Sequence, residues 1–104
     1  MEIIRMSEME TSTTPKKVQG RKLIDRDGLV VMNLLLKPGE EVPSHKTPVN
    51  VLFQIVKGEG TIEVGEEKGE VQENDLVYSP KNIPHALEAN KDKEFHVLVI
   101  KLPQ

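Results

Sequence analysis

The sequence predicts a single-domain, all-β protein of the sandwich or barrel type. Short apolar runs alternate with turn signals of Gly, Pro, Asn and Asp at intervals of roughly 8 to 12 residues, as in such folds. A chain of 104 residues suits one domain. The apolar content is mainly Val, Ile and Leu, since only Phe53, Tyr78 and Phe95 are aromatic, and branched side chains favour sheets. No stretch has the period of a long helix.

We predict that residues 1–20 form an N-terminal arm and that residues 21–104 form the barrel. Glu2–Met6 has the composition of a short strand. Ser7–Pro15 is polar, has no period and ends in proline, which predicts a flexible connection or a disordered tail.

A hairpin follows the arm. Lys22–Ile24 and Leu29–Leu36 flank the sequence Asp25-Arg26-Asp27-Gly28. Asp-Gly between two apolar runs favours a hairpin turn, because both residues tolerate the left-handed backbone conformation. Leu29–Leu36 is nearly continuous in apolar residues, which is typical of a strand covered on both faces.

The next stretch, residues 37–60, reads KPGEEVPSHKTPVNVLFQIVKGEG. It predicts a turn at Pro38-Gly39, a strand at Val51–Val56 and a second turn at Lys57–Gly60, with His45 just before the strand. Alternation along the strand points Gln54 away from Phe53, toward solvent or a subunit interface. We interpret the glycines of the second turn as hairpin residues and not as a phosphate loop, because no helix follows them.

The remainder of the chain predicts further short strands joined by turns. The strands are Thr61–Val64, Leu76–Ser79, His85–Ala89 and Phe95–Leu102, and an irregular corner is expected between Pro80 and Pro84. The complete pattern corresponds to about eight to ten strands.

Composition excludes several classes of function. The formal net charge is −3 with both signs interspersed, so no basic stripe is available for nucleic acid and no polybasic anchor for a membrane surface. The absence of cysteine excludes disulfides and thiolate chemistry. No apolar run is long enough to span a membrane or to form a signal sequence. A soluble cytoplasmic protein is the expectation.

Two groups of residues resemble the signature motifs of the cupin superfamily. In the first, Gly39 is followed after five residues by His45, and Gly58 closes the motif. Thr47 stands where the family has a second histidine, and Val51 stands where it has a glutamate.

The second motif places its matches on Pro80 and His85. Asn74 and Asn82 stand in for its two glycines, and Ala89 occupies its asparagine position. The resemblance spans about residues 29 to 101. It implies a cupin-type jelly-roll β-barrel (double-stranded β-helix), with His45 and His85 pointing into one cavity. It also implies a homodimer, often with N-terminal strands exchanged, but no single reaction.

A divalent transition metal in the barrel is the first hypothesis for function. The imidazoles of His45 and His85 are too few to hold the metal ion firmly, so a third donor is required. His96 is the first candidate, followed by Asn50 and Thr47. The ion would act as a Lewis acid or dioxygen site in a dioxygenase or isomerase acting on an oxygen-rich small molecule.

Two other hypotheses remain open. Thr47 and Val51 stand where the family motif has a histidine and a glutamate, and this difference favours a non-enzymatic ligand-binding or sensing domain without metal. A metal-free isomerase with His45 or His85 as general base needs a cationic partner, but Lys46, Lys57 and Lys81 are all placed in turns or at strand ends.

The expected cavity wall contains Val51 and Phe53 beside the histidines, with His96 as a further candidate. Tyr78 could act as a general acid, but core packing with its hydroxyl satisfied is the expected role.

Overall fold

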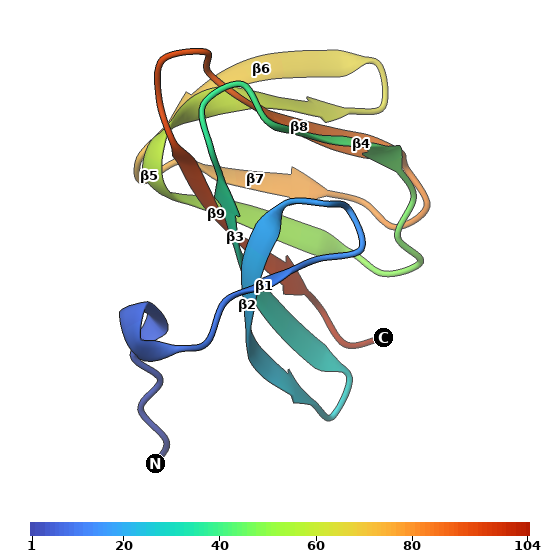
Figure 1. The fold of residues 1–104 in the computed structure, drawn as a ribbon. Coiled ribbons are helices and arrows are strands. Elements are labelled where there is room, and N and C mark those ends of the chain that lie inside the picture. Colours follow the sequence, from blue (N-terminus) through green and yellow to red (C-terminus); the bar gives the residue numbers. More distant parts are fainter.

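The computed structural model describes residues 1–104 and contains nine β-strands and one short 3-10 helix (Figure 1). The helix is η1 (Met6–Glu8), and the strands are β1 (Ser12–Thr13), β2 (Gln19–Arg26), β3 (Leu29–Leu36), β4 (Glu41–His45), β5 (Val51–Val64), β6 (Glu67–Gln72), β7 (Leu76–Ser79), β8 (His85–Ala89) and β9 (Phe95–Lys101). The structure has no helix that is long and apolar enough to cross a membrane.

The strands curl into an antiparallel sheet in the order β1-β2-β3-β9-β5-β8-β4, and β6 and β7 also pair with β5. β5 joins the two halves of the fold. Its first half pairs with β9 and β7, and its second half pairs with β6 and β8. Figure 1 shows β4, β6 and β8 facing β2, β3 and β9 across the interior. The predicted all-β jelly-roll barrel is confirmed.

The predicted turn at Lys57–Gly60 is wrong, because β5 continues through it without a reversal. The glycines allow a bend within this single strand. The β5–β9 register shifts between Ile55 and Lys57, and Gly58 has a φ of +83°. A Cβ at Gly58 would overlap the carbonyl oxygen of Glu94. Glycine therefore lets β5 pass close to β9 while it crosses from one half of the barrel to the other.

Three predicted turns are confirmed by their backbone geometry. The hairpin between β2 and β3 has positive φ at Asp27 (53°) and Gly28 (81°), as a primed turn requires. Asn74 and Asn82, which stand in for motif glycines, have φ values of 74° and 64°. Asparagine is a frequent non-glycine residue in this region of backbone space, so the substitutions preserve the turns.

The N-terminal arm lies against its own barrel. Glu2–Met6 forms no strand, and the stretch predicted as a flexible connection contains η1 and β1. β1 pairs with β2 of the same chain. Arg21 Nη1 donates a hydrogen bond of 2.6 Å to the Met6 carbonyl, and Arg26 pairs with Glu2 at 2.7 Å. Exchange of this arm with a partner subunit stays a prediction.

The core lies between the two halves of the barrel and is built from aliphatic residues around two phenylalanines. Its members are Val18, Leu36, Val42, Val51, Phe53, Ile55, Ile62, Leu87, Ala89, Phe95, Val97 and Val99. Most of these alternate along β5, β8 and β9, because successive side chains of a strand point to opposite faces. The pattern fixes which side of each strand faces the interior.

The outer face of β9, β5 and β7 is also largely apolar. The register places Tyr78, Leu52 and Ile100 in one row and Leu76, Gln54 and Leu98 in the next. The predicted outward position of Gln54 is confirmed. The predicted core position of Tyr78 is wrong, since Tyr78 is 55% exposed while its neighbours on β7 point inward.

Candidate ligand cavity

A cavity of about 420 Å³ lies inside the barrel and contains both motif histidines. Its wall is mainly apolar, with Val30, Met32, Leu34, Val42, Phe53, Leu87 and Val99 from β3, β4, β5, β8 and β9. The Thr14–Lys16 segment of the arm covers part of the same cavity. The predicted place of Phe53 in this wall is confirmed, whereas Val51 is fully buried in the core and lies outside the wall.

Strand pairing brings His45 and His85 together. They are register partners at the end of β4 and the start of β8, although far apart in sequence. Their ring centroids are 4.6 Å apart with the planes at 83°, and Phe53 packs edge-on against His85 with centroids 5.1 Å apart. The barrel therefore supplies the pairing that sequence spacing alone could not.

Both ring nitrogens of His85 have protein partners. Nδ1 lies 2.8 Å from the Ser79 hydroxyl oxygen, and Nε2 lies 3.2 Å from the Thr47 hydroxyl oxygen. A neutral imidazole has one donor and one acceptor, and each hydroxyl can take the complementary role. Ser79 is a member of the site that sequence reasoning missed. Its hydroxyl is fully buried at the end of β7, just before Pro80, and no local sequence signal marks it.

His85 is neutral at physiological pH. Burial is the main reason that its pKa is lowered to about 4, and the positive charges of His45, Lys101 and Lys16 lower the pKa further. The side chain is only 3% exposed, so its charged form would lose most of its hydration. His85 thus acts as a fixed hydrogen-bonding group in the wall and not as a cation.

His45 has one ring nitrogen free. Its Nδ1 lies 3.0 Å from the Pro43 carbonyl oxygen. A carbonyl can only accept, so Nδ1 carries the hydrogen and donates it. In the neutral ring, Nε2 is then an acceptor, and no protein group hydrogen-bonds to it. This nitrogen can accept a hydrogen bond from a ligand or remove a proton from it.

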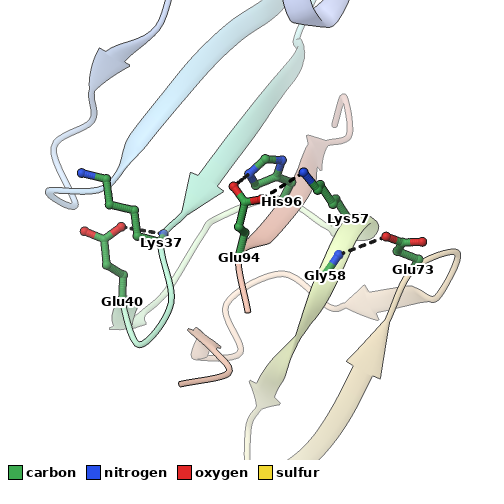
Figure 2. Close-up of polar contacts among 7 residues, drawn as sticks. All are labelled: Lys37, Glu40, Lys57, Gly58, Glu73, Glu94 and His96. Carbon is green, nitrogen blue, oxygen red and sulfur yellow. Dashed lines mark hydrogen bonds and ion pairs between the residues drawn. The ribbon is translucent and has the colours of Figure 1, made fainter. Parts of the chain in front are cut away.

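His96 does not join the other two histidines. Residues of β9 that face the interior are Val97 and Val99, so alternation places His96 on the outer face. Figure 2 shows its ring directed at Glu94, with Nε2 3.3 Å from a carboxylate oxygen, and Glu94 also pairs with Lys57 at 2.9 Å. Partial burial is the main reason that the pKa of His96 is lowered, so at neutral pH its uncharged ring is a hydrogen-bond partner of Glu94 on the outer surface of the barrel.

The other candidate donors are also accounted for. The Asn50 side-chain oxygen accepts a hydrogen bond of 2.9 Å from the Lys81 backbone, which ties two loops together. Thr47 does face the cavity, but its hydroxyl contacts His85. Only Thr47 among the three predicted third donors lies beside the histidine pair.

The residues present do not fit a resident divalent metal ion. No three His, Cys, Asp or Glu side chains lie together in a ligating arrangement. The cavity offers two imidazoles and a neutral hydroxyl, and His85 Nε2 is already engaged by Thr47. Catalytic metal sites usually have three protein ligands of imidazole, carboxylate or thiolate type. The donor chemistry therefore favours a cavity that works without metal.

Four lysines line the cavity, and the sequence reasoning missed this feature. They are Lys16, Lys22, Lys46 and Lys101. Lys46 is indeed in a loop after β4, but that loop forms part of the cavity wall. Lys16 comes from the arm, whose position over the cavity the sequence did not predict. The cationic partner that a metal-free reaction needs is thus present.

Comparison with family models supports the resemblance seen in the motifs. The model of the cupin domain matches residues 32–101, which is more than half of the chain. The chain belongs to the cupin family. The matched region contains β4, β5 and β8, the strands that carry or flank the histidine pair.

Solved structures share this cupin fold over nearly the whole chain. A conserved protein of unknown function from Streptococcus pyogenes is 24% identical, with 100% of this chain and 96% of that chain covered and a TM-score of 0.78. The polyketide cyclase RemF from Streptomyces resistomycificus is 18% identical, with 97% and 78% covered and a TM-score of 0.86. KdgF from a Halomonas species is 15% identical, with 100% and 94% covered and a TM-score of 0.88. At these identities the likeness establishes the fold. None of the curated proteins compared with the chain matches it.

Proposed function

We propose that this cupin binds a small organic molecule in its barrel cavity without a resident metal ion. The observation that carries the proposal is the apolar cavity of about 420 Å³ beside the unpaired Nε2 of His45. Small-molecule sites are typically concave, mainly apolar and supplied with a few fixed polar groups. This cavity has all three properties.

The histidine pair defines the polar end of the proposed ligand site. Ser79 and Thr47 hold the His85 ring, and the His85 ring packs edge-on against His45. His45 Nε2 would then accept a hydrogen bond from a hydroxyl or amide of the ligand. The same nitrogen could serve as a general base, and a cyclase among the structural neighbours supports the idea that this fold can host reactions on organic molecules.

The metal-dependent alternative has one observation in its favour. Donation from His45 Nδ1 to a backbone carbonyl is the arrangement commonly seen in metal-binding histidines. A dioxygenase or isomerase site would, however, require His85 Nε2 to leave Thr47 and a third donor to enter the cavity. We therefore place metal-free binding first.

Binding of hexanol to chelator-treated protein tests the proposal. We expect hexanol to shift the NMR signal of the Met32 methyl group, which lies in the cavity wall, and not that of the exposed Met1. Val30→Phe should weaken this binding by filling the cavity, whereas Val56→Phe, on the exposed outer face, should not. Equal hexanol affinity in the two variants, or no shift at Met32, would refute the proposed site.

A homodimer is also proposed, because the apolar outer face of β9, β5 and β7 needs a cover. Leu76 is 61% exposed, and an antiparallel sheet that faces water usually alternates with polar residues. A two-fold dimer would bury the same patch on both subunits. Leu76→Glu combined with Tyr78→Glu should give a monomer by sedimentation equilibrium, with Glu66→Lys as a surface control. A wild-type monomer at high protein concentration would exclude the dimer.

Cytoplasmic location and the absence of nucleic-acid or membrane partners stay predictions from composition.

A further inference from the structure

We propose that the ligand of the barrel cavity is an organic anion, with an apolar body in the cavity and a carboxylate-type group at the lysines. This inference rests on the proposed function and adds the chemical class of the ligand. It is carried by the distribution of charge around the cavity, which differs sharply from that of the whole chain.

The cavity wall is cationic although the chain is acidic. The chain has 17 Asp and Glu against 14 Lys and Arg. The wall of the cavity contains four lysines and no Asp or Glu. A wall that sampled the chain at random would contain both signs. The barrel therefore concentrates positive charge at its cavity and keeps its carboxylates elsewhere.

Three of these lysines have no compensating partner. Lys22 pairs with Asp25 at 3.2 Å, but Lys16, Lys46 and Lys101 form no ion pair. Uncompensated charges beside a low-dielectric wall focus their field and attract an ion of opposite sign. The charges of Lys16 and Lys101 already act on the site, because both lower the pKa of His85.

Three separate elements bring these lysines to one place. Lys101 ends β9, where it is the register partner of Val30 on β3 and of Val51 on β5. Lys46 directly follows His45 at the end of β4. Lys16 sits in the turn that follows β1.

Hydrogen bonds hold that turn in place. The backbone N–H and the hydroxyl of Thr14 both donate to the Val18 carbonyl at 2.8 Å, and the Lys17 N–H donates to the Thr14 carbonyl at 2.8 Å. These local bonds fix the shape of the turn that carries Lys16, and the burial of Val18 in the core and the pairing of β1 with β2 attach that turn to the barrel. Convergence of an arm, a loop and a strand end at one opening is a feature of the folded chain that no local sequence motif encodes.

The apolar part of the wall indicates that the rest of the ligand, away from its anionic group, is also apolar. Met32, Phe53 and Leu87 offer no hydrogen bonds, so a highly hydroxylated ligand would leave polar groups unpaired there. An inorganic anion would bind only at the lysines and leave the apolar volume unfilled. An amphiphilic organic acid satisfies both surfaces at once.

Three probes with the same apolar body and different head groups test this inference. Hexanoate, hexanol and hexylammonium are titrated separately into the full chain at pH 7 and low salt, with the Met32 methyl signal as readout. We expect hexanoate to bind about tenfold more tightly than hexanol, and hexylammonium to bind least, because the lysine field attracts only the carboxylate. Added salt should reduce the preference for hexanoate.

Lysine variants identify the source of the preference. Lys16→Gln, Lys46→Gln and Lys101→Gln combined should remove the preference for hexanoate and leave hexanol affinity unchanged, which also shows that the cavity is intact. A control with the same charge change, Lys68→Gln, Lys91→Gln and Lys93→Gln combined, should keep the preference. Equal binding of hexanoate and hexanol by the wild type would overturn the anion inference and leave the proposed function standing. Failure of all three probes to bind at the cavity would overturn both.

Discussion

Gly58→Ala is expected to lower the free energy of unfolding by about 3 kcal/mol or more. Two penalties combine at this position. The φ of +83° is unfavourable for any residue with a Cβ, and the added Cβ would overlap the Glu94 carbonyl oxygen. Relief would require β5 to move away from β9 at the point where Gly58 is the register partner of Phe95, a fully buried core residue.

A matched glycine on a neighbouring strand provides the control. A Cβ at Gly69, on β6, would meet no atom within 4 Å, and its φ is not in the left-handed region. Gly69→Ala should therefore change stability by less than about 0.5 kcal/mol. Urea unfolding of both variants measures the difference. Similar stability of the two variants would contradict the close approach of β5 and β9 at Gly58.

Acidification below pH 6.5 is expected to destabilise the fold through His85. Its pKa is about 4 in the folded protein, below the ordinary value of 6.5, mainly because the ring is buried. Between these two pH values the unfolded chain binds a proton that the folded chain does not, so the free energy of unfolding decreases as pH falls. At about 1.4 kcal/mol per pH unit, the loss approaches roughly 3 kcal/mol near pH 4.

A variant without the titrating ring separates this effect from that of the carboxylates. His85→Gln keeps a polar side chain beside Ser79 and Thr47 but cannot gain the proton. Urea unfolding at pH 7, 5.5 and 4.5 should show a steeper loss of stability for the wild type than for His85→Gln. Parallel pH profiles for the two proteins would mean that His85 is protonated as easily in the folded chain as in the unfolded one.

Much of the framework could be predicted from local sequence because turns report their own geometry. Asp27-Gly28, Asn74 and Asn82 are residue types that tolerate positive φ, and all four residues have positive φ in the structure. The resemblance to the cupin motifs also implied that His45 and His85 share one cavity, and the structure pairs them across β4 and β8. The turns could be predicted because each depends on residues that are neighbours in sequence, whereas the histidine pair required the resemblance to the family.

Other features depend on which face of a strand is covered, and sequence could not decide this. Both faces of β9 are apolar, so alternation groups His96 with Leu98 and Ile100 but does not say which group faces the cavity. In the same way, glycine marks either a turn or a close approach of two strands. Only the path of β9 beside β5 shows that Gly58 is the second.

The cationic character of the cavity was beyond local reasoning for a different reason. Lys16, Lys46 and Lys101 lie in three distant segments, and their charges gather only when the arm, β4 and β9 meet. Ser79 became recognisable as a partner of His85 only when the register of β7 against β5 was known. Sites assembled from long-range pairing require the folded chain.

Elemental analysis of untagged protein, purified without chelator, tests most directly the claim that this cupin cavity works without a resident metal. The donor set of two imidazoles and a threonine hydroxyl predicts far less than one transition metal ion per chain, with no difference between the wild type and a His45→Ala, His85→Ala double variant. A content close to one ion per chain in the wild type, lost in the double variant, would contradict the account and restore a histidine-bound metal as the centre of function.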